Sequence, residues 1–381
     1  MQDSSDDAAL RRQLRESVAV FTQRNPGAAR IRRIRATGLG IDAAAWAEMA
    51  AAGWLGLAVP EAVGGLGLGL GELCTVAEAL GGGLAPEPLV ATTLAIAVVA
   101  AAGPGALLET LCAGDARAAL AWQEQENTLD PFPVATMARP VAGGMAIAGV
   151  KRFIPAAAGA GGFIVTAQAP DGLAAFWVPA DSPGLRLETD RTVDGGQLGT
   201  LHLDGVIVPG VLLADAGGAV VRALDEARVA VAAELFGLMQ RALAMTVDYS
   251  KQRAQFGKPI GSFQVLQHRM VDLWMQQEVT RATLADALAV FGRTDDPASR
   301  AVAASAAKSR ASAAAMLVTR QAIQLHGGIG YADEHDIGLY LKRAIVLSGW
   351  LGSAALHRRR YGALTPDWDS APQDMFQENA A

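Results

Sequence analysis

The chain has 381 residues, of which 51% are hydrophobic and 18% charged, a globular composition with room for two or three domains. Its formal net charge of −6 argues against nucleic acid or an anionic membrane surface as a partner. Cys74 and Cys112 lie far apart without metal-ligand or redox spacing, so we expect reduced cysteines, no metal site and a cytoplasmic location.

Residues 1–118 are rich in Ala and Leu at helical spacing and predict an N-terminal α-helical domain. The first residues are acidic and polar, unlike a signal peptide. The apolar run 89–102 contains two threonines and is short for a membrane span, so we expect a buried helix. The glycines between residues 64 and 71 lack the spacing of a dinucleotide-binding loop and indicate a connector before a helix that starts near Glu72.

Residues 119–218 change to a period of two, which is typical of strands. Turn-forming clusters of Pro, Asp and Gly separate the apolar runs from one another. The expected strands cover residues 145–150, 163–168, 173–178, 185–188 and 201–206. This segment therefore predicts a middle antiparallel β-domain.

Residues 219–365 predict a C-terminal helical domain, followed by a flexible tail at 366–381. An apolar stripe from Leu224 to Tyr249 indicates one long helix that ends in basic residues, where cations complement the helix dipole. A second helix begins near Phe263. Asp296 and Pro297 predict the cap and first turn of a third, which ends at the glycines 327 and 328.

The loop between the first two of these helices reads YSKQRAQFGKPIGSFQ over residues 249–264. It places a guanidinium, an aromatic ring and free backbone donors at one corner between rigid elements. That combination suits recognition of a pyrophosphate with an attached ring.

Residues 253–260 (RAQFGKPI) resemble the signature of the acyl-CoA dehydrogenases. Residues 324–331 (QLHGGIGY) and 341–343 (LKR) resemble a second motif of that family, and residues 53–56 and 60–65 fit its amino-terminal part. The resemblance covers roughly residues 10–361. It implies an α+β fold with an N-terminal helical domain, a middle β-domain and a C-terminal four-helix-bundle domain.

The resemblance also implies the chemistry. In that family FAD oxidises an acyl-CoA thioester to the enoyl thioester, and a carboxylate removes the α-proton. The glutamate that usually does so aligns with Leu351, and the alternative position used by a second branch aligns with Ala227. Neither side chain accepts a proton. Glu234 is a candidate for a displaced base, or else a buried structural or interfacial carboxylate, while Asp225 and Glu226 are interpreted as helix-start residues.

The segments that contact the flavin ring in the family also differ here. The hydroxyl-bearing loop aligns with residues 122–130 (WQEQENTLD), and the tryptophan-containing strand with residues 151–155 (KRFIP). Pro155 removes both a side-chain donor and a backbone N–H. Ser353 is the polar residue that persists in the carboxyl-terminal loop.

The residues that would contact the ADP half of a neighbouring subunit's FAD are retained. The resemblance assigns cofactor contact to Arg253, Phe256, Gln264, Gln324, Gly327 and Gly328, with Ser353 as a further candidate. His326 is expected to orient its loop. An arginine and a glycine-rich helix end can bind a pyrophosphate without a local catalytic base.

Three hypotheses follow. In the favoured one, the chain is a subunit of a heteromeric acyl-CoA dehydrogenase, closest to the small-subunit branch of pimeloyl-CoA or steroid-degrading enzymes, and a homologous partner in an α2β2 assembly carries the glutamate. The second is a self-sufficient homo-oligomeric dehydrogenase or oxidase that uses Glu234. The third is a non-enzymatic structural or regulatory descendant. Acyl-CoA as substrate is implied by the resemblance alone.

Overall fold

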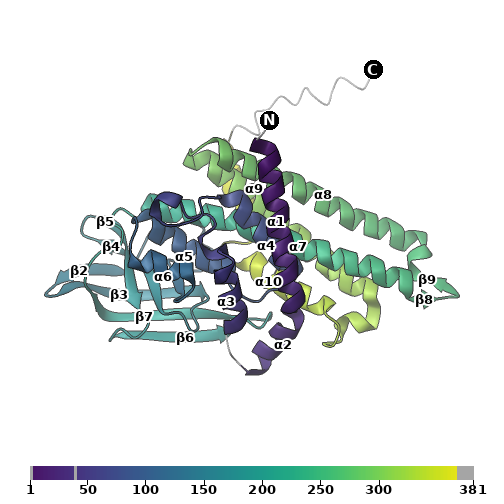
Figure 1. The fold of residues 1–381 in the computed structure, drawn as a ribbon, viewed down its shortest axis with the longest axis horizontal. Helices are drawn as coiled ribbons and strands as arrows, with labels where there is room; N and C mark the ends of the chain where they lie inside the picture. The colour runs from purple at the N-terminus through teal and green to yellow at the C-terminus, as the bar shows by residue number, and fades with distance from the viewer. Residues whose placement is uncertain (1–2, 38–40, 367–381) are drawn as a thin grey trace, which may run out of the picture.

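The computed structural model describes residues 3–37 and 41–366. Helices from both ends of the sequence flank a sheet built by the middle of the chain (Figure 1). The expected α+β fold, with helical, β and helical parts in that order, is confirmed. Residues 367–381, most of the expected flexible tail, lie outside the described residues.

The N-terminal part is helical, as the alanine and leucine spacing predicts. Asp42 caps its third helix, because its carboxylate accepts the backbone N–H groups of Ala44 and Ala45. The apolar run at residues 89–102 forms the predicted buried helix. The elements are α1 (Asp3–Arg24), α2 (Gly27–Thr37), α3 (Ala43–Ala51), the short 3-10 helices η1 (Trp54–Gly56) and η2 (Glu61–Val63), α4 (Leu70–Gly82), α5 (Leu89–Ala101) and α6 (Ala106–Ala113).

The middle part is a seven-stranded sheet with the path β1-β4-β2-β3-β7-β6, and β5 pairs with β4. Its strands are β1 (Ala118–Ala121), β2 (Met137–Val141), β3 (Gly144–Pro155), β4 (Gly162–Ala169), β5 (Gly172–Pro179), β6 (Leu185–Arg191) and β7 (Gln197–Val208). The five predicted runs lie in β3 to β7. Most pairs are antiparallel as expected, but β1 and β2 each run parallel to β4.

The C-terminal part is organised around α7 (Gly217–Gln252), which contacts α4, α5, α8, α9 and α10. Long and apolar enough to cross a membrane, α7 has 78% of its most apolar window buried in protein, as a core helix should. Asp296 caps α9 as predicted, accepting the Ser299 N–H at 2.8 Å. The remaining elements are the hairpin β8 (Ala254–Gln255) and β9 (Lys258–Pro259), η3 (Ile260–Ser262), α8 (Gln264–Arg293), α9 (Pro297–His326), η4 (Gly327–Tyr331), α10 (Ile337–Gly349) and α11 (Ala354–Leu364).

Two glycines allow α4 and α7 to pack backbone against backbone. A Cβ added at Gly237 would lie 1.8 Å from the carbonyl oxygen of Glu78, and one at Gly81 would lie 2.3 Å from that of Glu234. No side chain fits at either position unless the helices move apart. This close approach fixes the height of the middle of α7 against α4.

We therefore predict that Gly237→Ala lowers stability by about 1–3 kcal/mol, because the added methyl group overpacks the helix contact. Gly218→Ala is the matched control. Gly218 lies in the same helix with nothing within 4 Å of its added Cβ, so the change is neutral or stabilises by up to about 1 kcal/mol through helix propensity. Thermal unfolding followed by calorimetry measures both, and an equal midpoint in the two variants would contradict the packing argument.

Candidate functional site

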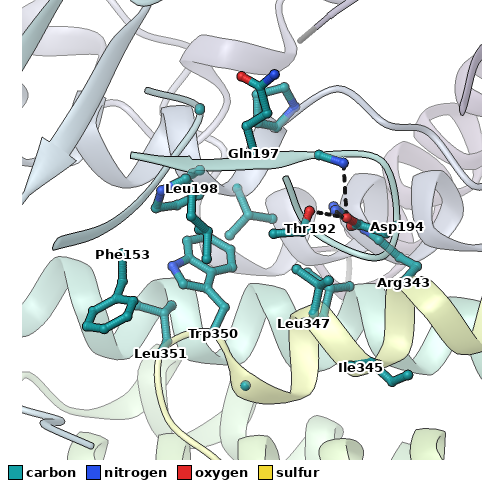
Figure 2. A pocket seen from close by; sticks show the side chains of 18 of the residues that line it. Phe153, Thr192, Asp194, Gln197, Leu198, Arg343, Ile345, Leu347, Trp350 and Leu351 are labelled. Atoms are coloured by element: carbon teal, nitrogen blue, oxygen red, sulfur yellow. Dashed lines mark hydrogen bonds and ion pairs between the residues drawn. The ribbon is translucent and has the colours of Figure 1, made fainter. Parts of the chain in front are cut away.

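A cavity of about 470 Å3 lies where the β-domain meets the helices. Figure 2 shows Gln197 and Leu198 of β7 on one side of it and Leu347 and Trp350, at the end of α10, on the other. Most of its wall is apolar. The apolar lining residues include Leu89 and Val90 of α5, Phe153 and Pro155 of β3, and Ile345, Val346, Leu351 and Leu356 of the carboxyl-terminal segment.

Leu351 lies in the wall of this cavity, in the loop between α10 and α11. It is 3% exposed and has a φ of +57°, a left-handed backbone conformation that a leucine rarely adopts. Ser353 lines the same cavity, and its hydroxyl oxygen caps α11 by accepting the Leu356 N–H. Ala227 lines a separate cavity of about 310 Å3 between α5 and α7. Both positions to which the resemblance assigns the base thus carry apolar side chains that line cavities.

Three buried nitrogen-bearing side chains hold the Leu351 loop from behind. Lys308 of α9 donates to the carbonyl oxygen of Gly352 at 2.9 Å. His357 Nε2 of α11 lies 2.9 Å from the Leu351 carbonyl oxygen, and Arg228 Nε of α7 donates to the same oxygen at 3.5 Å. Because three helices converge on adjacent carbonyl groups, the strained backbone at Leu351 is fixed by its surroundings.

Burial changes the ionisation of these groups. Desolvation, with a contribution from the nearby Arg228 charge, lowers the pKa of Lys308 to about 7. Desolvation and the charges of Arg228 and Lys308 lower the pKa of His357 to about 3. Burial opposes the charge of Asp225, but Arg228 and Arg360 hold its pKa below the ordinary value.

The interpretation of Asp225 and Glu226 as helix-start residues is wrong, because α7 begins at Gly217 and both residues lie in its third turn. Asp225 is buried and pairs with Arg228 at 2.5 Å. Glu226 pairs with Arg222 at 2.9 Å on the rim of the second cavity.

Glu234 reaches the large cavity but is ion-paired. Arg343 donates to it at 2.7 and 3.0 Å and to Asp194 at 2.9 Å, so one guanidinium joins α7, α10 and the β6–β7 turn. Burial alone would lower the pKa of Arg343, yet the two carboxylates raise it, so it stays charged. Burial opposes the charge of Asp194, but Arg343 and Thr192 keep its pKa low. Figure 2 shows Asp194 and Arg343 at one end of the cavity.

Several polar side chains of the lining are engaged with their own chain. Gln123 donates to the Gln125 carbonyl oxygen at 2.9 Å, and Thr128 donates to the same atom at 3.2 Å. Arg117 donates to the Gly159 carbonyl oxygen at 2.6 Å. Phe153, which replaces the expected indole, has a φ of +56°. An isoalloxazine ring needs donors for its carbonyl oxygens and ring nitrogens, and these groups do not offer them. Gln123, Thr128 and Arg117 would have to break these bonds to serve a flavin ring.

The loop at residues 122–130 is positioned by a buried ion pair. Lys151 is fully buried and donates to Glu124 at 2.7 Å, and the carboxylate also accepts the N–H groups of Ala135 and Thr136. Desolvation lowers the pKa of Lys151 to about 8, although Glu124 partly opposes it. Burial opposes the charge of Glu124, but the bond from Lys151 and those from residues 135 and 136 lower its pKa to about 2.

The other predicted cofactor residues lie together at the far end of the helical domain. Tyr249, near the end of α7, stacks on His326 at the end of α9 with ring centroids 4.5 Å apart, which joins the two motifs. Phe256 is 92% exposed at the tip of the β8–β9 hairpin, which projects from the bundle in Figure 1. This region contains Arg253, Phe256, Gln264, Gln324, Gly327 and Gly328, which we name the cofactor surface.

The cavity and the cofactor surface are separated along one helix. Glu234 and Arg253 are 19 positions apart on α7 and its C-cap, or about 28 Å at the helical rise per residue. That distance is far longer than the ribityl chain that links the ring of FAD to its pyrophosphate. The structure therefore brings six of the seven predicted contacts together and places Ser353 in the other site.

A second cluster, which the sequence reasoning missed, holds the loop after η4. Asp333 accepts Arg35 at 2.6 Å and Lys342 at 3.2 Å, and Arg32 donates to its carbonyl oxygen at 2.7 Å. The bonds from Arg35 and Lys342 hold the pKa of Asp333 well below its usual value. Helix α2 thus fastens the segment that follows Gly327 and Gly328. The closely spaced arginines within residues 30–35 are the sequence feature that could have indicated this cluster.

Comparison with known proteins identifies the family. Residues 9–115 match the N-terminal domain of acyl-CoA dehydrogenases, and residues 217–363 match their C-terminal domain. The chain belongs to the acyl-CoA dehydrogenase family. It is 36% identical to acyl-CoA dehydrogenase IpdE2 of Mycobacterium tuberculosis, over 88% of this chain and 90% of that protein.

Solved structures share the fold of this chain over most of its length. The chain superposes on a chain of the Tcur3481-Tcur3483 steroid acyl-CoA dehydrogenase variant with a TM-score of 0.86 and 33% identity, over 96% of this chain and 100% of that one. It superposes on a chain of the ChsE4-ChsE5 complex of Mycobacterium tuberculosis with a TM-score of 0.83 and 25% identity, over 95% and 98%. Other chains of this fold were solved with FAD or FADH2, and FAD is the cofactor of the family.

The lowered pKa of Lys308 predicts that the free energy of unfolding depends on pH. The pKa of Lys308 is about 7 in the folded chain and about 10.5 when the lysine is exposed. Between these two pH values the folded state binds fewer protons than the unfolded state, so the free energy of unfolding rises with pH. We expect this rise from about pH 7 to about pH 9 to be smaller in Lys308→Met. Urea unfolding across that range measures it. Lys258→Met is the exposed control and should retain the full rise, whereas equal slopes in wild type and Lys308→Met would refute the assignment.

Proposed function

We propose that this protein is a subunit of a heteromeric acyl-CoA dehydrogenase that lacks its own catalytic base and completes the FAD site of a homologous partner. The observation that carries the proposal is the separation of the cofactor surface from a cavity whose base position is Leu351. When bound, FAD supplies the hydride acceptor for oxidation of an acyl-CoA thioester.

The first support is the state of the carboxylates at the cavity. Removal of an α-proton requires an ionised, unpaired carboxylate that points at the substrate carbon. Asp194 and Glu234 both bond to Arg343, and Glu126 is exposed in its loop. Leu351 occupies the position from which the family's glutamate acts. Among the described lining residues, the two buried carboxylates are therefore engaged with Arg343, and the remaining one, Glu126, is exposed to solvent and not desolvated as a base for this reaction should be.

The second support is the cofactor surface, whose residues face solvent. Arg253 provides a guanidinium for a pyrophosphate, and Gly327 and Gly328 provide accessible backbone where α9 ends. Since this surface is about 28 Å along α7 from the chain's own cavity, its nucleotide belongs to a neighbouring subunit.

The third support is the exposed apolar surface of the bundle. Large apolar side chains on α8 are about half exposed, and a contiguous patch of this kind marks a protein interface. They are Val265, Val271, Trp274, Met275 and Val279. Two structurally similar proteins are named as pairs of distinct chains, so we propose a homologous partner in an α2β2 assembly. By analogy with the steroid enzyme, a fused-ring acyl-CoA is the proposed substrate class.

The alternative is a self-sufficient enzyme in which Glu234 acts as the base. The location of Glu234 in the cavity wall favours it. It would require Glu234 to leave Arg343, and that separation would leave buried charges uncompensated at a cost of roughly 3–5 kcal/mol. The subunit role needs no such rearrangement.

Arg253→Ala tests the cofactor surface. We expect the complex with the homologous partner to bind FAD roughly 10- to 150-fold more weakly, because a charge-assisted hydrogen bond contributes about 1.5–3 kcal/mol. Lys251→Ala removes another exposed cation from the same helix end and should leave FAD affinity unchanged. Flavin fluorescence titration measures both. Unchanged affinity in Arg253→Ala would support a scaffold that contacts no nucleotide.

Glu234→Gln tests whether the partner subunit or Glu234 of this chain supplies the catalytic base. If the partner supplies the base, the purified complex should retain turnover within about threefold, since the amide still accepts a bond from Arg343. A loss of turnover by several orders of magnitude, with the protein still folded, would instead identify Glu234 as the base. Steady-state oxidation of an acyl-CoA thioester gives the answer.

A further inference from the structure

We propose that the exposed face of α9 selects a carboxylate-bearing helix of the homologous partner and disfavours a second copy of this chain. The inference rests on the proposed function in one respect, that the partner is a homologous but different chain. It adds the residues that distinguish the two. We name this face the α9 ridge, which consists of Arg310, Ala313, Leu317, Arg320, Gln321 and Gln324.

The α9 ridge is one continuous stripe along the helix. Between residues 301 and 326 the exposed positions are 313, 317, 320 and 324, which recur at steps of four, three and four. From Arg310 to Gln324 the stripe covers 14 positions, or about 21 Å at the helical rise per residue. A second helix that packs alongside would bury it over about four turns.

The middle of the ridge is apolar. Leu317 is 43% exposed, and it lines a shallow groove together with Tyr331 and Leu341. Arg320 and Gln324 form the polar edge of the same groove. An apolar side chain of a partner helix would fill this groove, with the guanidinium of Arg320 beside it.

The ridge continues two surfaces that the proposed function already uses. At one end Arg310 donates to the side-chain oxygen of Gln276 at 2.6 Å, next to the exposed Met275 of α8. At the other end Gln324 belongs to the cofactor surface. A helix on the ridge would therefore extend the interface proposed for α8 as far as the neighbouring subunit's nucleotide.

The charge of α9 is one-sided. Its 30 residues include no aspartate or glutamate but four lysines and arginines, although the whole chain has a net charge of −6. Arg300 pairs with Asp295 at 2.7 Å, and Lys308 is fully buried. Arg310 and Arg320 therefore remain on the ridge as guanidiniums without a carboxylate partner among the described residues.

Two polar atoms of the ridge are buried without a hydrogen-bond partner in the part of the chain that the structure describes. They are Nε of Arg310 and the side-chain oxygen of Gln321. Burial lowers the pKa of Arg310, and no neighbouring carboxylate opposes that shift. Since an unpaired buried donor or acceptor is costly, these atoms favour a partner that supplies an acceptor near one end and a donor near the other.

Self-association of the ridge is disfavoured by its charge. A two-fold contact places the same patch of both subunits face to face. In an antiparallel contact centred on the ridge, Arg310 of one copy would lie opposite Arg320 of the other, and desolvated like charges repel. A helix with carboxylates at these places would instead form charge-assisted hydrogen bonds with both guanidiniums. The charge thus favours a different chain over a second copy.

The spacing of the arginines defines the partner helix. Arg310 and Arg320 are ten positions apart, or about 15 Å along the axis. A helix lying alongside therefore needs two carboxylates about eleven positions apart on one face, because that separation returns to the same side of a helix. Between them it needs an apolar side chain that reaches Leu317.

Arg310→Ala/Arg320→Ala tests the selection on the full-length chain. Binding to the homologous chain that carries the catalytic glutamate should weaken at least tenfold, and the loss should shrink at high salt. Self-association of the variant should instead become at least threefold tighter, because the repulsion is removed. Sedimentation of fluorescently labelled chain, alone and with the partner, measures both. These opposite changes exclude a general loss of structure, which would weaken both.

Arg358→Ala/Arg359→Ala is the matched control. It removes two exposed arginines of α11, off the ridge, and should leave both affinities within about twofold of wild type. Arg320→Ala alone is the second test variant, since Arg320 makes no hydrogen bond or ion pair among the described residues that folding would lose. Far-UV circular dichroism verifies that each variant is folded.

The outcomes separate the inference from the proposed function. Unchanged binding of the ridge variants to the partner, or weakening of partner binding and self-association together, overturns the inference and leaves the proposed function intact. If the wild-type chain does not assemble with the homologous chain and turns over acyl-CoA as a homo-oligomer, both fail.

Discussion

The length of α7 sets the distance between the cavity and the cofactor surface. A single helix of 36 residues carries Glu234 at the cavity and delivers Arg253 to the opposite end of the bundle. Glycine contacts with α4 fix its height against the N-terminal helices. Since a helix cannot shorten, these two sites cannot approach each other, and one cofactor cannot occupy both from the same chain.

The large cavity combines an apolar wall with buried ionisable groups. The apolar lining is combined with buried charges that pair with one another, as Arg343 does with both Asp194 and Glu234. Such an arrangement is costly to form but specific in geometry, because each partner must stay in place to compensate the others. Lys308 differs, since it is buried without a carboxylate partner and relies on carbonyl oxygens and a serine hydroxyl.

Much of the fold could be predicted from local sequence patterns. The apolar stripe before Tyr249, the cap at Asp296 and five alternating runs all correspond to elements of the structure. The strand β1 was missed because its sequence, AALA, has no β-branched or aromatic residue. The strand β2 contains Pro140 and an exposed arginine, which weaken the strand signal.

The site was less predictable because its decisive contacts are remote in sequence. Arg343 and Glu234 are 109 positions apart, and Lys308 lies 44 positions before the carbonyl group it binds. Periodicity reports only neighbours within a few turns. The residues that the two motifs group together, Arg253 to Gln264 and Gln324 to Gly328, lie at one end of the helical domain. The resemblance had already grouped Ser353 with the flavin-ring segments, and Ser353 lines the cavity.

The exposed ring of Phe256 affects how an unassembled copy of the chain would behave in a cell. A side chain 92% exposed, beside the apolar face of α8, makes an unassembled copy prone to association with unintended neighbours. In the proposed heteromeric assembly, the amount of partner would set how long such a copy persists, because assembly removes the vulnerable form by mass action. Balanced synthesis of the two polypeptides would be a requirement of this architecture.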